Sequence, residues 1–486
     1  MEPFERFSGL AKTLGRISVA ANRPVVCIQG LGFVGAVMAL AVASARNAEG
    51  TPTFDVVGVD LPTREGMAKV EAINAGKFPV QSTDPGIGEA MELAWKTGNF
   101  IATTRPDAYK LAAVCVVDIH LDLAQSREGR PTVCYDGMQQ AVRSIATHMP
   151  PGGLIVVETT VPPGTCARII APEVQATLRQ RGLPDDALLL AHSYERVMPG
   201  EQYLDSLVNF WRVYAGHTPQ AAHACERFLA QVINTRDYPL TRLASTTASE
   251  IGKVLENSYR AVTIALMEEW GRFAEALDVD LFDVIRAIRH RPTHANMRQP
   301  GFGVGGYCLT KDPLFADVAA RELWHLPEHV QFPLCQQAVA LNQAMPLASL
   351  NKLEALLGGS LRGKHVLLLG VSYRQDVGDT RFSASEIFVR AARARGASVV
   401  CHDPLLQYWH ELDMALPKRL PRPAGMDAVV FAVAHHAYVQ LDLIEWLGQE
   451  RPIILDANHV LTKTQRADVE KLRCTLWSIG RGQGTG

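Results

Sequence analysis

The chain has 486 residues, more than the roughly 250 to 300 at which one hydrophobic core stops growing, so two or three domains are expected. Its 48 basic and 50 acidic residues nearly cancel and form no long run of one sign, which argues against nucleic acid or an acidic membrane surface as a partner. Its nine cysteines show no Cys-x-x-Cys pair and no zinc-type Cys/His spacing, so we predict no metal site and reduced thiols in a cytoplasm.

We expect the N-terminal region to carry no export signal. Residues 1–22 mix charged and apolar residues at near-helical spacing, which predicts a helical extension and not a signal peptide. The longest apolar segment, residues 34–45, is too short to cross a bilayer and is predicted to be a buried helix that follows a strand. We therefore expect a soluble, cytoplasmic protein.

Short β-branched runs alternate with helix-like segments, which predicts parallel sheets built from βαβ units. The first runs lie at residues 25–29, 55–59, 114–117, 154–158 and 188–192. Helical patterns dominate residues 246–342, with the longest at 248–277, and strand runs return at residues 365–369, 398–401, 428–433 and 453–455. The predicted fold class is α/β, with two parallel-sheet domains at 23–240 and 346–486 joined by a central helical domain at 241–345.

A glycine-rich turn follows the first strand. Gly30-Leu31-Gly32-Phe33-Val34-Gly35 leads directly into the apolar helix, the context of a Rossmann-type dinucleotide-binding fingerprint. The glycines permit a tight turn and let a pyrophosphate approach the helix N-terminus. Asp60 ends the second strand and is predicted to bind the adenosine ribose, which favours NAD over NADP. The alternative is a glycine turn with only a structural role.

Two further loops follow predicted strands at the edge of the sheet where ligands bind in open α/β folds. Thr160 lies in the loop Thr159-Thr160-Val161-Pro162-Pro163-Gly164, and Glu195 and Arg196 lie in the loop after the next strand. For Thr160 the alternative is an ordinary strand exit stopped by two prolines. For Glu195 the alternative is a solvated loop carboxylate.

Lys253 and Asn257 are four residues apart in the long helical segment, so they share one helix face and could direct two donors at one oxygen. The alternative is a surface lysine beside a tolerated helical asparagine. Small and apolar neighbours, including Ala244, Ile251 and Val254, predict that this helix is buried and that the two donors need partners.

The segment from Pro300 to Pro313 contains four glycines in six positions, followed by Cys308, Lys311 and Asp312. The glycines would let the backbone approach a ligand closely. A thiol beside a cation ionises more readily and becomes a competent nucleophile. Any single cysteine is more often a small buried hydrophobe, but the loop context favours a nucleophile here.

Taken together, these motifs resemble the UDP-glucose/GDP-mannose dehydrogenase family. The order GLGFVG, TTVPPG, YERVMPG, GK–N, PGFGVGGYCLTKD and YRQDVGDTR runs from Gly30 to Arg381, and the likeness extends from about Pro24 to Gly480. Within the family, YERVMPG and PGFGVGGYC look most like the branch that acts on UDP-N-acetylhexosamines of the N-acetylmannosamine, N-acetylglucosamine or N-acetylgalactosamine type.

The resemblance implies a mechanism with two hydride transfers to two successive NAD molecules. Cys308 would hold the C6 aldehyde as a thiohemiacetal, whose oxidation gives a thioester that water hydrolyses to a uronate. Lys253 and Asn257 would stabilise the oxyanions, Asp312 with Thr160 would hold the water, and Glu195 would act as the base. The resemblance also implies a homodimer or higher homo-oligomer and a role in polysaccharide or glycoconjugate precursor synthesis.

Binding residues follow from the same resemblance. It implies NAD contacts from the glycine turn, Asp60, Arg64, Thr160, Lys311 and Arg381. It implies nucleotide-sugar contacts from Glu195, Arg196, Lys253, Asn257, Gly301, Phe302, Gly303, Gly305, Tyr373 and Arg374.

The last domain begins with a strand that ends in Gly370-Val371-Ser372-Tyr373 and lacks a GxGxxG turn, so we predict that it binds no second dinucleotide. Residues 383–386, Ser-Ala-Ser-Glu, predict a capping box that opens the next helix. Arg374 and Arg381 precede this helix, in a loop suited to a diphosphate.

Several positions depart from the family pattern. Arg64 is four and not five residues after Asp60, and Val117-Asp118-Ile119-His120 replaces the usual Pro-Thr-Pro turn near NAD. The family's arginine that reaches across the dimer is replaced near His294, with Arg291 and Arg298 as candidate substitutes, so the identity of the sugar stays open.

Two rival functions remain. A β-hydroxyacid-type NAD dehydrogenase shares a Rossmann domain and the Lys-x-x-x-Asn spacing but performs a single two-electron oxidation, and Cys308 and the last domain argue against it. A catalytically silent protein that senses NAD or a nucleotide sugar would keep the fold without the chemistry, which the retained Cys308, Lys253, Asn257 and Asp312 disfavour.

Overall fold

The computed structural model describes residues 23–126, 129–198 and 200–482. The chain divides into two compact units. Unit 1 comprises the described residues up to Leu255 together with Phe315–Gln331, and unit 2 comprises Glu256–Leu314 and the described residues from Phe332 onwards. The predicted helical extension at residues 1–22 lies outside the described residues.

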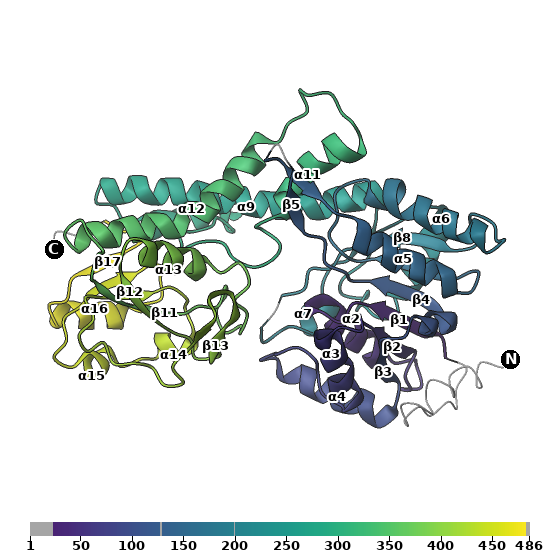
Figure 1. The fold of residues 1–486 in the computed structure, drawn as a ribbon, viewed down its shortest axis with the longest axis horizontal. Helices are drawn as coiled ribbons and strands as arrows, with labels where there is room; N and C mark the ends of the chain where they lie inside the picture. The colour runs from purple at the N-terminus through teal and green to yellow at the C-terminus, as the bar shows by residue number, and fades with distance from the viewer. Residues whose placement is uncertain (1–22, 127–128, 199, 483–486) are drawn as a thin grey trace. The chain divides into compact units, whose positions relative to one another are not determined.

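Unit 1 is built on an eight-stranded sheet with the order β10-β9-β8-β7-β4-β1-β2-β3 (Figure 1). Its strands are β1 (Val25–Gln29), β2 (Asp55–Val59), β3 (Phe100–Thr103), β4 (Ala112–Val117), β7 (Leu154–Val157), β8 (Leu189–His192), β9 (Val213–Gly216) and β10 (Thr241–Arg242). Neighbouring strands are parallel except β8 and β9. The five strands predicted for this part of the chain are confirmed, and the parallel ladder brings their carboxyl ends to one edge.

Helices cover both faces of this sheet, because alternate residues of each strand point to opposite faces and both sets are apolar. One face is covered by α2 (Phe33–Ser44), α3 (Arg64–Asn74), α4 (Pro85–Thr97), α7 (Asp205–Val208) and α8 (Pro219–Leu229). The other is covered by η1 (Pro106–Leu111), α5 (Asp136–His148), η2 (Cys166–Ile170), α6 (Ala171–Gln180) and α11 (Phe315–Val318), which is followed by η5 (Ala319–Leu323). The strands β5 (Leu123–Gln125) and β6 (Pro131–Val133) form a separate hairpin. The predicted buried helix is confirmed as α2, in which residues 35–43 are all buried.

The predicted long helix is confirmed as α9 (Thr246–Ala276), which begins in unit 1 and ends in unit 2. The prediction that it is buried holds for only one face. Lys253 and Val254 are buried, whereas the Ile251 side chain is 47% exposed and Ala244, just before the helix, is also exposed. Unit 2 continues with α10 (Leu281–Arg289), η3 (Pro292–His294) and η4 (Asp312–Leu314).

Unit 2 contains a five-stranded parallel sheet with the order β12-β11-β15-β16-β17. Its strands are β11 (His365–Leu369), β12 (Ser398–His402), β15 (Ala428–Phe431), β16 (Ile453–Asp456) and β17 (Leu476–Ser478). One face packs on α12 (Pro333–Leu356) and α13 (Ala384–Ala394), and the other on α14 (His436–Val439), α15 (Leu443–Leu447) and α16 (Lys463–Lys471). A small hairpin, β13 (Tyr408–Trp409) and β14 (Met414–Ala415), flanks η6 (His410–Leu412). The predicted class, two Rossmann-like sheets and a helical middle, is confirmed.

Two local predictions need correction. The chain does not break at Pro346, because α12 continues through it to Leu356, and Pro346 packs on the Gly303 backbone. The expected boundary between residues 345 and 346 therefore falls inside a helix. Ser383 does cap α13, but its hydroxyl accepts from the Ser385 N–H. No capping box forms, because the Glu386 carboxylate accepts from Arg390 Nε at 2.8 Å instead.

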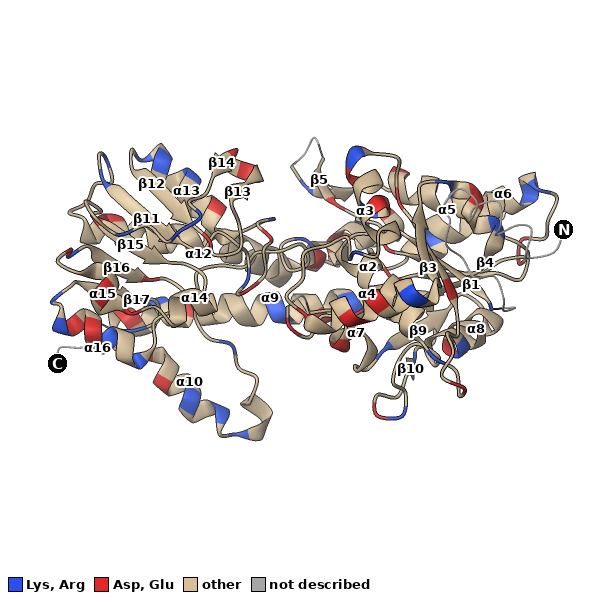
Figure 2. Cartoon of the chain, turned by 90° about the horizontal axis from the view of Figure 1, so that it is seen from below, with Lys and Arg blue, Asp and Glu red and all other residues tan. Residues whose placement is uncertain are grey.

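Acidic and basic residues are interspersed over the ribbons of both units (Figure 2), in keeping with the balanced composition. Within the described ranges, no helix is long and apolar enough to span a bilayer.

Candidate functional site

The glycine turn after β1 has the geometry that a dinucleotide requires. Gly30 has a φ of +93°, and a Cβ there would lie 2.3 Å from the Asp118 carbonyl oxygen. A Cβ on Gly35 would lie 1.9 Å from the Gly30 oxygen, whereas one on Gly32 would meet nothing within 4 Å. The first and third glycines are therefore needed by the protein itself, and the open space at Gly32 lets a pyrophosphate reach the N-terminus of α2.

Asp60 stands directly after β2, as predicted. Its Oδ2 accepts from the Leu31 N–H at 3.1 Å and its Oδ1 from the Leu61 N–H at 2.7 Å. The side chain remains 13% exposed, and the Lys69 ammonium lies 3.8 Å away. Asp60 is thus tied to the glycine turn while part of the carboxylate stays accessible to a ribose hydroxyl. Arg64, the first residue of α3, is exposed.

The loop that carries Thr160 is held by a buried carboxylate. Glu250 of α9 is 1% exposed, and its two oxygens accept from the Gly164 N–H at 2.5 Å and the Cys166 N–H at 2.8 Å. These two N–H groups lie at the start of the helical segment η2–α6, where a negative charge is favourable. Burial raises the pKa of Glu250 to about 7, although the two backbone donors act to lower it.

Glu195 is not the solvated carboxylate that its loop position allowed. It is 8% exposed, and Lys253 Nζ lies 3.4 Å from its Oε1 and donates to its carbonyl oxygen at 2.7 Å. Arg196 donates to the Trp211 carbonyl oxygen at 2.7 Å and lies over the Tyr194 ring. The structure thus brings Glu195 and Lys253, 58 residues apart in the sequence, into contact.

Three more charged residues lie near the carboxyl ends of the strands in this sheet. Arg212 and Glu158, both nearly inaccessible to solvent, form an ion pair, and Arg212 Nε donates to Ser193 Oγ at 3.1 Å. Asp118 Oδ2 is buried without a hydrogen-bond partner among the described residues. Burial, and then the neighbouring Glu195, raise the pKa of Asp118 well above its usual range, while Arg212 opposes the rise. Asp118 therefore holds its proton more firmly than an exposed carboxyl does.

In unit 2, the structure brings Asn257 and Asp312 into contact. Asn257 Nδ2 donates to Asp312 Oδ2 at 2.7 Å, and Lys311 Nζ lies 3.0 Å from Asp312 Oδ1. Asp312 is fully buried and Asn257 is 5% exposed. Both carboxylate oxygens of Asp312 are therefore paired with nitrogen donors, which satisfies a buried charge.

Cys308 is exposed, and its carbonyl oxygen accepts from the Asp312 N–H at 2.9 Å. All nine cysteines lie among the described residues, none forms a disulfide, and six are buried. One turn of backbone therefore connects Cys308 to Asp312. Most of the other thiols are core residues, as predicted.

The glycines before Cys308 pack against the segment between β11 and α13. A Cβ on Gly305 would lie 2.7 Å from Tyr373 Cβ, and one on Gly303 would lie 2.6 Å from Ala384 Cβ. A Cβ on Gly301 would lie 3.0 Å from the Asn458 side chain, and the buried Phe302 donates from its N–H to the same side chain at 3.3 Å. From the sequence, we expected these glycines to let a ligand approach the backbone closely. The structure shows that the packing of neighbouring protein segments already requires glycine at these positions.

Arg374 and Arg381 lie in the loop between β11 and α13, as predicted. Arg374 is exposed. Arg381 pairs with Asp379 at 2.7 Å and lies over the Tyr307 ring. Burial acts to lower the pKa of Arg381, but Asp379 raises it above the usual range. Tyr373 is half-buried, and burial raises its pKa to about 12.

The candidate cross-subunit residues lie after α10. Arg291 and Arg298 are exposed, and His294 is partly buried in η3. Burial lowers the pKa of Arg298, and the nearby Arg260 lowers it further. In the part of the chain that the structure describes, no group of three or more His, Cys, Asp or Glu residues could hold a metal ion.

Sequence reasoning missed several of these groups. Glu250, Lys253 and Asn257 recur at positions i, i+3 and i+7 of α9, so they share one face, and this spacing could have identified Glu250. No local signal pairs Glu158 with Arg212, because 54 positions separate them and only the sheet brings them together.

Comparisons with known proteins agree with this geometry. Models of the UDP-glucose/GDP-mannose dehydrogenase family match residues 24–233 (NAD binding domain), 247–344 (central domain) and 367–463 (UDP binding domain). A UDP-N-acetyl-D-mannosamine dehydrogenase of Methanocaldococcus jannaschii is 28% identical over 90% of this chain and 93% of its own. An NDP-N-acetyl-D-galactosaminuronic acid dehydrogenase of Ralstonia nicotianae is 27% identical over 86% and 92%. The solved structure of a UDP-D-ManNAc dehydrogenase of Pyrococcus horikoshii has a similar fold, with a TM-score of 0.77, 24% identity and coverage of 95% of this chain and all of that one.

Proposed function

Because the chain belongs to the UDP-glucose/GDP-mannose dehydrogenase family and is an NAD-dependent nucleotide-sugar dehydrogenase, we propose that it oxidises the C6 alcohol of a UDP-N-acetylhexosamine to a carboxylate. The UDP binding domain supports the nucleotide. The names of the relatives, which act on N-acetylated hexosamines, support the class of sugar. The observation that carries the chemistry is the turn that links the exposed Cys308 to the buried Asp312 and its donor Asn257.

The reaction removes four electrons from the sugar. The glycine turn after β1 and Asp60 would hold NAD, which would supply the hydride acceptor for C6 in each of the two oxidations. The Cys308 thiolate adds to the aldehyde carbon after the first oxidation and forms a C–S bond, which gives a thiohemiacetal. The second oxidation converts this adduct to a thioester, and water then adds to the carbonyl carbon and displaces the thiolate. One alcohol, two NAD and one water thus give one carboxylate, two NADH and three protons.

We assign oxyanion stabilisation to Lys253 and Asn257, which lie one turn apart on α9. Their present partners are acceptors, the Glu195 carbonyl oxygen and the Asp312 carboxylate. An alkoxide or tetrahedral oxyanion offers the same kind of acceptor to an ammonium and an amide N–H. Each such donor typically contributes about 10²- to 10³-fold to the rate.

We assign thioester hydrolysis to Glu195, Asp312 and Thr160. Glu195 contacts Lys253, so a proton that the carboxylate takes from water remains beside a hydrogen-bonding partner. Asp312 lies four residues after Cys308, and the family resemblance assigns to it and to Thr160 the role of holding the water. A positioned base of this kind typically contributes about 10²- to 10⁴-fold.

We further propose that the protein is a homodimer built on an apolar face of α9 and α10. Four large apolar side chains of α9 in unit 2, and one directly after the helix, are between 44% and 58% exposed, at Tyr259, Leu266, Trp270, Phe273 and Leu277. On α10, Val284 and Ile288 are 40% and 37% exposed. A row of this length on one helix is typical of a protein interface. We place the dimer contact in the central helical domain for this reason.

We also propose that the protein works in the cytoplasm and supplies a uronate for polysaccharide or glycoconjugate synthesis. A nucleoside-diphosphate uronate is an activated glycosyl donor, so the reaction that consumes it would be a glycosyl transfer.

The decisive experiment measures NADH formed per sugar consumed, with UDP-linked N-acetylmannosamine, N-acetylglucosamine, N-acetylgalactosamine and glucose as a panel. We expect two NADH per sugar for at least one N-acetylated substrate and slower turnover of UDP-glucose. One NADH per sugar, with a free aldehyde or ketone as product, would contradict the thioester mechanism and favour a hydroxyacid-type dehydrogenase. Binding of NAD and UDP-sugar without turnover of any substrate would favour a silent sensor.

A further inference from the structure

The two sheets of this protein contain the same turn with different chemistry. In unit 1 the Gly30 N–H donates to the Val59 oxygen at 2.8 Å and the Leu31 N–H donates to Asp60 Oδ2 at 3.1 Å. In unit 2 the Gly370 N–H donates to the His402 oxygen at 2.8 Å and the Val371 N–H donates to Asp403 Oδ2 at 3.0 Å.

The strand orders agree with this equivalence. β1 lies between β2 and β4, and β11 lies between β12 and β15. Gly30 and Gly370 both have positive φ, +93° and +100°. Asp403 therefore occupies the position that Asp60 occupies in the dinucleotide-binding sheet.

The two carboxylates differ in what surrounds them. Asp403 Oδ2 accepts from the Val371 N–H, from the Ser372 N–H at 3.0 Å and from the Ser372 hydroxyl at 2.8 Å, while Oδ1 accepts from the Leu405 N–H at 3.0 Å. The Asp403 side chain is fully buried, whereas that of Asp60 is 13% exposed. A ribose hydroxyl cannot reach this carboxylate, because the Asp403 side chain is fully buried and the protein's own donors already bind both of its oxygens.

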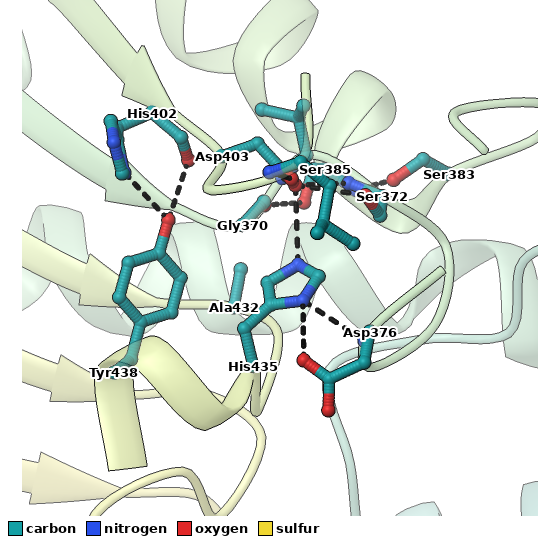
Figure 3. Close-up of polar contacts among 12 residues, drawn as sticks. Gly370, Ser372, Asp376, Ser383, Ser385, His402, Asp403, Ala432, His435 and Tyr438 are labelled. Carbon is teal, nitrogen blue, oxygen red and sulfur yellow. Dashed lines mark hydrogen bonds and ion pairs between the residues drawn. The ribbon is translucent and has the colours of Figure 1, made fainter. Parts of the chain in front are cut away.

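His435 closes the remaining side of this carboxylate (Figure 3). It follows β15, its side chain is fully buried, and its Nε2 lies 3.2 Å from Asp403 Oδ2. The Asp376 N–H can only donate, and it points at His435 Nδ1 at 3.0 Å, so Nδ1 is the acceptor and the proton lies on Nε2. Burial acts to raise the pKa of Asp403, but the bond from His435 and the backbone donors leave it below the usual value.

These bonds fix both ends of one short loop. Asp403 holds Val371 and Ser372, and His435 holds Asp376 through its backbone N–H. Between these anchors lie Tyr373 and Arg374, the residues that we assign to the nucleotide sugar. The side chains that anchor this loop are not its neighbours in the sequence. Asp403 follows β12 and His435 follows β15, so only the folded sheet brings them to the loop.

We propose that Asp403 and His435 are positioning residues that hold the loop from Val371 to Asp376 in the shape that binds the UDP moiety. They fill the position in the second sheet that corresponds to the ribose-binding position of the first. The proposal rests on the proposed function, since it takes UDP as the ligand of this domain. It also accounts for the prediction that this sheet binds no dinucleotide.

The test compares UDP and NAD binding by calorimetry in the full-length protein and three variants. In H435A, we expect about ten-fold weaker UDP binding and unchanged NAD binding, because the loop loses its anchor at Asp376 and Asp403 loses one of its donors, while unit 1 is untouched. In H435Q, the side-chain amide restores a donor to Asp403, and UDP affinity should return to within about three-fold of wild type. H436Q is the matched control, since His436 is the next residue, its side chain is 59% exposed and it contacts the Asp376 carboxylate from outside; it should bind both ligands normally.

Steady-state kinetics separate positioning from general loss of structure. A loosened loop should raise KM for the UDP-sugar in H435A with a smaller change in kcat, and H435Q should reverse the rise. UDP binding within two-fold of wild type in a folded H435A would overturn the proposal, as would parallel loss of UDP and NAD binding. If H435A does not fold, H435F decides in the same way, because phenylalanine keeps a ring in this position and removes both the donor to Asp403 and the acceptor for the Asp376 N–H. A wild-type protein that binds no UDP would instead contradict the proposed function.

Discussion

The buried carboxylate of Glu250 offers a prediction whose size follows from the structure. It is 1% exposed and binds two backbone N–H groups of the loop that carries Thr160. Glu250→Gln leaves one oxygen for two donors, so one buried N–H faces an amide nitrogen. Leaving such a group unsatisfied costs about 1 to 3 kcal/mol. We therefore expect the loop from Thr159 to Ile170 to open more often in this variant.

The same residue gives the loop a pH dependence. The pKa of Glu250 rises from 4.5 to about 7 in the folded protein, and each tenfold change in proton affinity is worth ~1.4 kcal/mol. Because the pKa is higher in the folded protein, the stabilisation that the protonated Glu250 gives to the loop is fully present below pH 4.5. It is lost as the pH rises through 7. Between pH 5 and pH 8 the loop should lose about 2 to 3 kcal/mol of local stability, whereas the glutamine variant does not titrate.

Amide hydrogen exchange of a peptide covering residues 159–170, followed by mass spectrometry, measures this directly. The ratio of protection in wild type to protection in Glu250→Gln cancels the intrinsic pH dependence of exchange. We expect that ratio to fall roughly 100-fold from pH 5 to pH 8, because ~1.4 kcal/mol is tenfold. Glu71→Gln, which changes an exposed glutamate of the same unit, should leave it constant. A ratio that is flat across this range, or that rises, would refute the reasoning.

Four further predictions concern the proposed chemistry and assembly. Cys308→Ala should abolish acid formation while NAD and UDP-sugar still bind in calorimetry, because the thiol makes the covalent bond and other groups make the contacts; full activity would exclude Cys308 as the nucleophile. Asp312→Asn should slow hydrolysis of the thioester by about 10²-fold or more, so intact-protein mass spectrometry after addition of substrate and NAD should detect a uronyl adduct. A variant that turns over at the wild-type rate and shows no adduct would contradict this role. Asp60→Ser should reduce the kcat/KM preference for NAD over NADP at least about tenfold, since removing a carboxylate removes its repulsion of a 2′-phosphate; an unchanged preference would place the ribose elsewhere. Trp270→Glu puts a charge into the exposed apolar face of α9 and should convert a dimer to a monomer, which light scattering measures. An unchanged mass would exclude this face as the dimer contact.

Local sequence was sufficient for the features that depend on neighbouring residues. The glycine turn, the buried helix after it and the acid at the end of β2 follow from residue type and spacing within about 35 positions, and the structure contains all three. Five of the eight strands in the sheet of unit 1 and four of the five in that of unit 2 were likewise predictable, because β-branched runs bounded by turn residues favour strands in any context.

The exceptions show where local rules stop. A domain boundary was predicted at residue 346, yet α12 continues through Pro346, because the proline packs on Gly303 within a helix that tertiary contacts stabilise. Ser383 capped the predicted helix, but the Glu386 carboxylate accepts from Arg390, while the Ser383 N–H donates to the Thr380 oxygen at 3.1 Å.

Tertiary structure alone decided the charge partners. The sequence identified Glu195 and Lys253 as candidates, but only the fold buries them together across 58 positions. It likewise pairs Glu250 with an N–H 84 residues away and Asp403 with His435 across 32 positions. A charged side chain has no period or local signature that names its partner, because burial and Coulomb attraction depend on distance in space. The sequence therefore determined which residues could do chemistry, and the fold determined which of them meet.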